Sequence, residues 1–222
     1  MRMENTQHRT GDLNTKLCVQ YGCGICAPDG WLNFDISPTL RLQKIPFLGR
    51  ILTAKLIQFP ANVRYGDIVR GLPLAKQSCE MVYCSHVLEH LALEDFRAAL
   101  NHTWDYLRPG GTFRFVLPDL EQLAHAYFKS NAEQPSVWFM ESTILGTKKR
   151  PRGLLSWVRH SLGNSRHLWM WDFKSIQVEL KKAGFVDIRR AYLGDGNNPM
   201  LADVENPILW GENNLGVQCK VP

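Results

Sequence analysis

The stretch Lys16 to Asp35, KLCVQYGCGICAPDGWLNFD, decides the fold of this chain. An apolar run leads into Gly22 and Gly24, and a second apolar run ends at Asp35. Glycines at the mouth of a strand let a ligand approach the backbone more closely than any Cβ would allow. A carboxylate at the end of the next strand can accept hydrogen bonds from both hydroxyls of a ribose. The stretch therefore predicts a nucleoside site at the carboxyl edge of a parallel sheet.

The spacing within this stretch decides which nucleoside cofactor fits. The letters GCGICA match the G-x-G-x-x-G/A fingerprint of dinucleotide enzymes, which need a helix directly behind it to hold a pyrophosphate. Residues 28–30 indicate a turn instead, and Asp35 follows Gly24 by only 11 residues. The dinucleotide pattern expects that acid about 20 residues on. A cofactor with a ribose but no phosphate fits better, and the common one is S-adenosylmethionine.

The rest of the chain alternates predicted strands and helices, which is typical of an α/β protein with a parallel sheet. Asp172 is expected as the N-cap of the last helix, and Gly184 as the residue just beyond its end. The expected strands are 16–20, 31–35, 61–65, 81–85, 112–117, 185–191 and 215–221, and the expected helices are about 47–58, 93–107 and 172–183.

Five motifs in order resemble those of the class I S-adenosylmethionine-dependent methyltransferases: GCG, GWLNFD, the GD of 66–67, SHVLEHL and LRPGG. The chain is most similar to the type 11-like group, near the branch associated with exopolysaccharide biosynthesis. The resemblance implies a Rossmann-like fold, with a seven-stranded, mostly parallel sheet and an antiparallel last strand. Two positions depart from the pattern. Gln20 stands where an acid usually holds the methionine amino group, and Cys26 replaces a third glycine.

Cofactor binding is expected at the carboxyl ends of the first four strands. Asp35 would hold the ribose, and Asp67 would face the adenine amino group with Ile68 and Leu72 beside the ring. Gly22 and Gly24 would lie under the methionine and ribose portion. The residues expected to bind the cofactor are Gly22, Gly24, Asp35, Asp67, Ile68, Leu72 and Ser85.

A hydroxyl acceptor must lose a proton, and a positioned base accelerates such a step about 10²–10⁴-fold. His86, just beyond the fourth strand, is placed to be that base, and Glu89 or His90 would orient it. The alternative is that His86 caps the following turn while Glu89 and His90 are structural. Asp119 and His167 are weaker candidates for the base.

Two segments without Asp or Glu bear on the acceptor. Residues 142–171 carry six Lys or Arg and three Trp, and residues 36–66 carry five Lys or Arg. Long segments at the carboxyl end of a strand often form substrate-binding lids. With a net charge of only +5, this clustering favours an anionic acceptor, such as a phosphorylated or lipid-linked sugar, or a membrane surface carrying that lipid. The alternative is that both segments are solvated faces with core aromatics.

The predicted function is methyl transfer from S-adenosylmethionine to an oxygen of a small or glycan-type acceptor. RNA methylation is the alternative activity, favoured by the basic aromatic segment. Against it, SHVLEH replaces the Asn/Asp-Pro-Pro-aromatic motif of base-methylating enzymes, and no RNA-binding module is recognisable. A methyltransferase-like binding subunit without catalysis is a third reading, which Gln20 and Cys26 keep open.

The length of 222 residues suits one methyltransferase domain, 16–222, with a basic, Trp-containing insertion at about 120–171 and a polar tail at 1–15. No run is long enough to span a membrane, and the tail lacks the apolar core of a signal peptide. The six cysteines then indicate reduced thiols in a cytoplasmic protein. Cys23 and Cys26 form a CxxC, but with Cys84 they make only three plausible ligands, so no metal is predicted.

Overall fold

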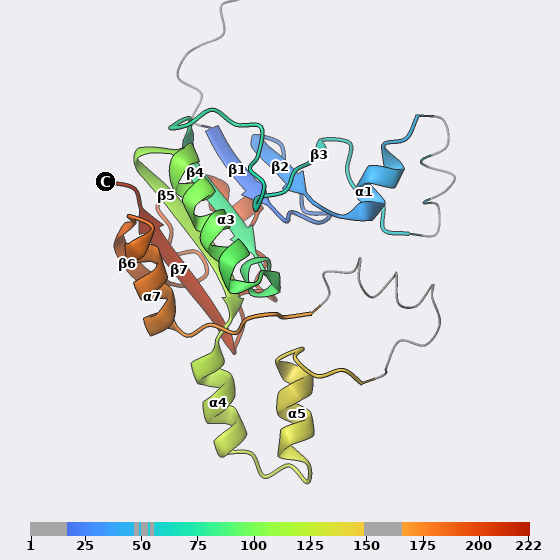
Figure 1. Cartoon of the computed structure of the whole chain (residues 1–222), viewed down its shortest axis with the longest axis vertical. Helices are drawn as coiled ribbons and strands as arrows, with labels where there is room; N and C mark the ends of the chain where they lie inside the picture. Colours follow the sequence, from blue (N-terminus) through green and yellow to red (C-terminus); the bar gives the residue numbers. More distant parts are fainter. Residues whose placement is uncertain (1–16, 47–48, 50–52, 54–55, 149–165) are drawn as a thin grey trace, which may run out of the picture.

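The computed structural model describes residues 17–46, 49, 53, 56–148 and 166–222 (Figure 1). The predicted polar tail, most of the predicted helix 47–58 and the middle of the basic segment 142–171 lie outside these described residues.

Seven strands form one sheet in the order β3-β2-β1-β4-β5-β7-β6. The pairs from β3 to β5 are parallel, whereas β7 runs antiparallel to both β5 and β6. This arrangement confirms the predicted mostly parallel sheet with an antiparallel last strand. The strands are β1 (Leu17–Tyr21), β2 (Trp31–Asp35), β3 (Val63–Tyr65), β4 (Cys79–Ser85), β5 (Leu107–Pro118), β6 (Val186–Ala191) and β7 (Asn214–Lys220).

The predicted helices 93–107 and 172–183 are confirmed as α3 (Leu93–Tyr106) and α7 (Phe173–Lys182). Asp172 caps α7, because its carboxylate accepts a hydrogen bond from the Ser175 N–H at 2.7 Å. Three short helices and two 3-10 turns were not predicted from the sequence: α1 (Pro38–Gln43), α4 (Leu120–Phe128), α5 (Pro135–Ser142), η1 (Leu88–His90) and η2 (Pro199–Asp203). Among the described residues, no helix has the length and apolar character needed to cross a bilayer.

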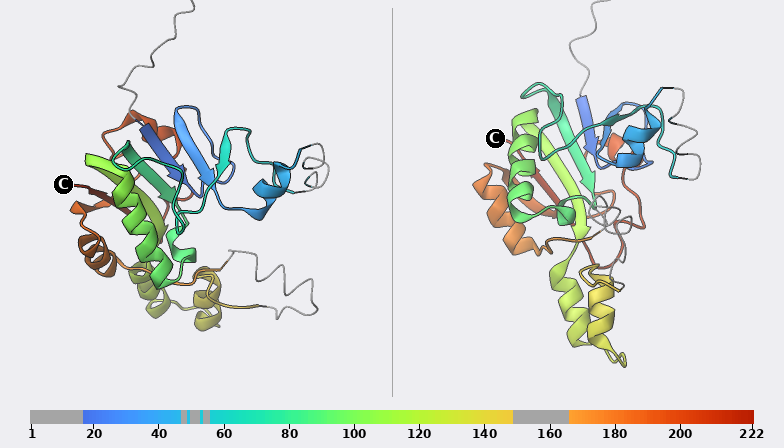
Figure 2. Two further views of the ribbon diagram at one scale, coloured as in Figure 1. Left: turned by 45° about the horizontal axis from the view of Figure 1, so that its top comes forward. Right: turned by 45° about the vertical axis from the view of Figure 1, so that its right-hand side comes forward.

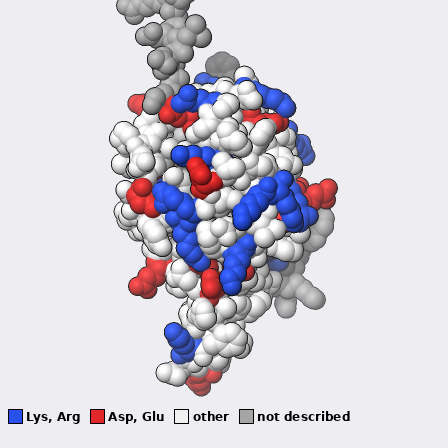
Figure 3. All heavy atoms as spheres, turned by 90° about the vertical axis from the view of Figure 1, so that its left-hand side faces the viewer, with Lys and Arg blue, Asp and Glu red and all other residues white. Residues whose placement is uncertain are grey.

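Helices α3 and α7 cover one face of the sheet (Figures 1 and 2). Phe96 of α3 and Leu180 of α7 are fully buried against the strands in the main hydrophobic core. Trp171, one of the three tryptophans of the predicted lid, belongs to this core, since its ring stacks on Phe96 at 4.2 Å between centroids. On the side of the molecule where α7 and β6 lie, basic side chains are interspersed with acidic ones (Figure 3).

The segment 192–213, which includes η2, packs against the other face, with Leu201 and Val204 in a smaller core. Arg114 of β5 is fully buried and holds this segment in place. Its guanidinium contacts Glu205 at 2.5 Å and Asp195 at 2.7 Å. The buried positive charge is thus matched by two carboxylates of the covering segment.

Helices α4 and α5 lie side by side and project beyond the carboxyl edge of the sheet (Figure 1). The rings of Tyr127 and Phe139 pack at 5.4 Å between centroids and join the two helices. Asp119 is the N-cap of α4, because its side chain accepts a hydrogen bond from the Glu121 N–H at 3.0 Å.

Candidate active site

A cavity of about 490 Å³ opens at the carboxyl edge of the sheet. Its volume is within the range of small-molecule sites, roughly 300–1,000 Å³. The segments that follow β1, β2, β3 and β4 form most of its wall. The lining residues are Tyr21, Gly22, Asp35, Ile36, Gly66, Asp67, Ile68, Val69, Arg70, His86, Val87, His90, Leu91, Asp95 and Leu168.

Gly22 stands where the turn after β1 meets the turn after β4. Its φ is +66°, and a Cβ built on it would lie 2.2 Å from the Val87 Cγ2 atom. Only glycine fits this close approach without a shift of Val87. The other glycine of the pair, Gly24, has a φ of +55°, but among the described residues no atom lies within 4 Å of the position that a Cβ would take.

Asp35 lies at the end of β2 and is only 9% exposed. One carboxylate oxygen accepts a hydrogen bond from the Gly24 N–H at 2.9 Å, and the other accepts one from the Ser37 N–H at 2.7 Å. A carboxylate has about four acceptor positions, so both oxygens keep capacity for a ligand. Gly24 does not line the cavity; it orients Asp35.

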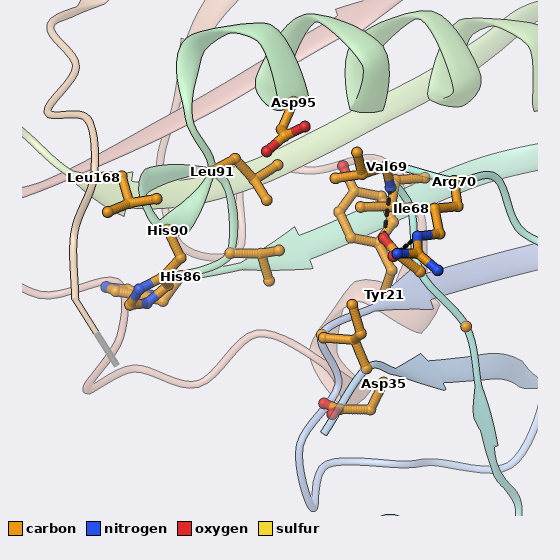
Figure 4. A pocket seen from close by; sticks show the side chains of 15 residues that line it. Tyr21, Asp35, Ile68, Val69, Arg70, His86, His90, Leu91, Asp95 and Leu168 are labelled. Carbon is orange, nitrogen blue, oxygen red and sulfur yellow. Dashed lines mark hydrogen bonds and ion pairs between the residues drawn. The ribbon is translucent and has the colours of Figure 1, made fainter. Parts of the chain in front are cut away.

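Asp67 follows β3 and is tied to its own loop. Its carboxylate accepts a hydrogen bond from the Val69 N–H at 2.9 Å and lies 3.4 Å from the Arg70 guanidinium (Figure 4). Ile68 is buried and lines the cavity. Leu72 does not line it; this side chain belongs to the main core.

Gln20, which replaces the usual acid, is buried beneath the glycine turn. Its side-chain N–H groups donate to the Asn33 side-chain oxygen at 2.6 Å and to the Cys26 carbonyl at 2.7 Å. The two departures from the family pattern therefore contact each other, and Gln20 fastens the turn to β2. Burial raises the pKa of the Cys23 thiol to about 12.

His86 follows β4 with an unusual backbone conformation, a φ of +53°. Its Nδ1 lies 3.1 Å from the Ser85 hydroxyl, and its Nε2 lies 3.2 Å from the side-chain oxygen of Asn214. An amide oxygen only accepts, so Nε2 carries the proton and Nδ1 accepts from Ser85. Burial lowers the pKa of His86, which favours the neutral ring. Ser85 therefore reaches the site through His86 and does not itself line the cavity.

The predicted orientation of His86 by Glu89 needs correction, because Ser85 and Asn214 are the partners of its ring. Glu89 lies in η1, fully buried, with one carboxylate oxygen 3.9 Å from Nε2 of His167. Burial raises the pKa of Glu89 to about 8 and lowers that of His167 to about 4. No sequence signal singled out Asn214, which begins the antiparallel strand β7.

Asp119, a weaker candidate for the base, is structural. Its carboxylate caps α4 and lies 3.1 Å from the Arg190 guanidinium. It is fully buried and does not line the cavity.

Several described residues of the two basic segments are used within the fold. Arg41 lies over the Tyr65 ring at 4.8 Å, and Lys148 pairs with Glu141 at 2.7 Å. Most cations of the predicted lid (Lys149, Arg150, Arg152 and Arg159) lie outside the described residues. The described end of that segment reaches the site, because Leu168 lines the cavity.

Comparison with known proteins gives one family, described as a methyltransferase domain, which matches residues 13–189. No curated protein matches the chain. Among solved structures, a methyltransferase of Archaeoglobus fulgidus is 16% identical, with 92% of this chain and 86% of that chain covered and a TM-score of 0.49. A methyltransferase of Thermotoga maritima is 13% identical, with coverages of 93% and 82% and a TM-score of 0.48. Human N-acetylserotonin methyltransferase is 15% identical, with coverages of 95% and 49% and a TM-score of 0.46.

Proposed function

This chain belongs to the methyltransferase-domain family, and we propose that it transfers the methyl group of S-adenosylmethionine to an oxygen of a small or glycan-type acceptor. It is a class I, S-adenosylmethionine-dependent enzyme; the acceptor and the residue roles are what we infer. One observation carries the proposal: a single cavity wall combines Asp35 and Asp67 with His86. Figure 4 shows Asp35 and Ile68 toward one end of this cavity and His86 toward the other.

The residues at the first end suit the nucleoside part of the cofactor. Asp35 would accept hydrogen bonds from the ribose hydroxyls, for which its oxygens keep capacity. Asp67 would accept one from the adenine amino group, with Ile68 beside the ring. Gly22 lines the cavity as well. When bound, the cofactor supplies a methyl group that its sulfonium has already activated for displacement.

The residues at the other end suit an acceptor hydroxyl. Holding the acceptor in line is worth roughly 7–11 kcal/mol of the barrier. We infer that Nδ1 of His86 accepts the hydroxyl proton, once the acceptor replaces Ser85 as its partner. Asn214 keeps the proton on Nε2 and so keeps Nδ1 basic.

The backbone of His86 supports a functional role. A non-glycine residue with a φ of +53° is strained, and such strain, of order 1–3 kcal/mol, concentrates at active sites. The His86 N–H donates to the Val116 carbonyl at 2.9 Å, which holds this conformation. A capping role alone would not require the ring to face the cavity.

For the acceptor we favour a phosphorylated or lipid-linked sugar. The acid-free segment 142–171 ends at the cavity wall through Leu168. The similarity of the motifs to the branch associated with exopolysaccharide biosynthesis points the same way.

The experiment is a transfer assay with methyl-labelled S-adenosylmethionine on matched acceptors. Neutral sugars, the corresponding sugar phosphates, lipid-linked sugars and RNA are offered to the full chain and to a His86→Gln variant. We expect transfer to an oxygen of a sugar phosphate or lipid-linked sugar, and a large loss of rate in the variant. Transfer to RNA alone, or turnover that His86→Gln leaves unchanged, would contradict the proposal.

A further inference from the structure

We propose that Glu89, His90 and His167 bind a divalent transition-metal ion beside the cavity. One ligand atom from each of the three lies within 4.8 Å of the others. Two imidazoles and a carboxylate suit ions such as Zn²⁺, Fe²⁺ and Co²⁺, whereas Mg²⁺ and Ca²⁺ prefer oxygen ligands. The sequence prediction of no metal rests on cysteine ligands only; Glu89 and His167 are far apart along the chain and meet only in the fold.

The carboxylate of Glu89 is the first reason. Glu89 is 0% exposed, and within the described part of the chain neither of its oxygens has a hydrogen-bond partner. A buried polar group without a partner is costly, and an ion would satisfy it. Its Oε1 atom lies 3.9 Å from Nε2 of His167. This is too long for a hydrogen bond, but two ligands at about 2 Å from one ion are separated by roughly 3–4 Å.

The tautomer of His90 is the second reason. Its Nδ1 lies 2.8 Å from the Arg166 carbonyl oxygen. A carbonyl only accepts, so Nδ1 carries the proton and the lone pair of Nε2 is available. Metal-binding histidines commonly donate their other N–H to a carbonyl in this way. The rings of His90 and His167 lie 4.9 Å apart at 72°, edge to face.

The backbone holds the three side chains together. The N–H groups of Leu168 and Trp169 both donate to the Glu89 carbonyl, at 2.8 and 3.1 Å. Together with the contact between His90 and the Arg166 carbonyl, these bonds fasten residues 166–169 to η1. The ligand set is therefore assembled by the fold itself, as a preformed site requires.

The position of the site suggests its use. His90 and Leu168 line the same cavity as His86. Three protein ligands leave at least one open position on such an ion, which an acceptor oxygen can fill. This use rests on the proposed transfer to oxygen, whereas the binding of the ion does not.

The test uses Co²⁺ alone, as a spectroscopic probe, on the full chain after treatment with EDTA and its removal. We expect one equivalent to bind with visible d–d absorption. Glu89→Gln and His167→Gln should each weaken binding at least about tenfold. His125→Gln is the matched control, because His125 is exposed on α4, and it should bind as the unmodified chain does. An unmodified chain that binds no Co²⁺, or variants that lose no more than the control, would overturn the proposal.

Calorimetry with S-adenosylhomocysteine separates this result from misfolding. The ligand variants should keep their affinity for it, because Asp35 and Asp67 are untouched. If Glu89→Gln does not keep its affinity for S-adenosylhomocysteine, the Co²⁺ affinities of His90→Gln and His167→Gln decide whether the site exists. If the unmodified chain did not bind S-adenosylhomocysteine, the proposed function would be contradicted. The Co²⁺ measurement would still test the metal site by itself.

Discussion

The imidazole Nε2 of His86 lies 3.2 Å from the side-chain oxygen of Asn214, which joins the end of β4 to the start of β7. Because β7 is antiparallel to its neighbours, its first residue stands at the edge where the parallel strands end. Asn214 thereby selects the tautomer in which Nδ1 of His86 is the basic nitrogen.

Removing the His86 ring should slow methyl transfer without weakening the binding of the cofactor. We expect His86→Gln to lower kcat about 10²–10⁴-fold, the worth of a general base, and Asn214→Ala to lower it less. The measurement is the transfer rate at saturating cofactor with an identified acceptor. Asn197→Ala, at an exposed position, should behave as the unmodified enzyme. If His86→Gln and Asn214→Ala both had the kcat of the unmodified enzyme, His86 would not be the general base.

Asp35 should govern cofactor affinity. Asp35→Asn loses the charge but keeps one acceptor oxygen, and we expect S-adenosylhomocysteine binding to weaken by about 1.5–3 kcal/mol, the worth of hydrogen bonds to a charged group. Asp35→Ala should lose more, since the Gly24 and Ser37 N–H groups also lose their partner. Calorimetry provides the affinities, with Asp29→Asn, at an exposed turn, as the control. Tight binding of NAD would contradict the assignment of the cofactor.

The two glycines of the turn should respond differently to an added methyl group. Gly22→Ala introduces a Cβ 2.2 Å from Val87 Cγ2 at a φ of +66°, whereas Gly24→Ala, at +55°, meets no atom of the described residues within 4 Å. Both changes strain the backbone by about 1 kcal/mol, so the larger loss at Gly22 reports the clash. Urea unfolding measures this difference. Val87→Ala should rescue Gly22→Ala in part and Gly24→Ala not at all.

The ion pair between α3 and α7 should make stability depend on pH. Hydrogen bonds from Arg97, then from Lys182, lower the pKa of Glu179 from its ordinary 4.5 to about 2. A depressed carboxyl pKa stabilises the fold above pH 4.5, and this contribution is lost as the pH falls toward 2. We therefore expect Glu179→Gln to lower Tm near neutral pH and to have little effect at pH 2. Glu94→Gln, exposed on α3, should show no such dependence.

Arg114 should be among the residues on which the fold depends most. Arg114→Met leaves Glu205, whose side chain is 2% exposed, as an uncompensated buried charge. Breaking a buried pair from one side costs about 3–5 kcal/mol. Urea unfolding measures the loss, and Glu205→Gln added to Arg114→Met should recover part of it. A loss no larger in Arg114→Met than in an exposed arginine variant would contradict this view.

Local signals in the sequence predicted the parallel sheet, helices α3 and α7, and the placement of Gly22, Asp35 and Asp67 at one edge. Such signals work because strand ends, caps and glycine turns depend on a few neighbouring residues. Short helices such as α1 escaped the reading, since six residues carry no apolar periodicity. Helices α4 and α5 were not predicted either; no residue of α5 is buried, so its apolar residues form no inward face.

What the sequence determined by itself is one end of the cavity, where Asp35 and Asp67 each lie at or just beyond the end of a strand that local signals predict. What only the tertiary structure decided is the other end. There, Asn214 from β7 orients His86, and His167 from beyond the insertion faces Glu89. The reason is physical: pairs so distant along the chain meet only because the sheet order and the backbone bonds of residues 166–169 bring them together, and no local pattern encodes that meeting.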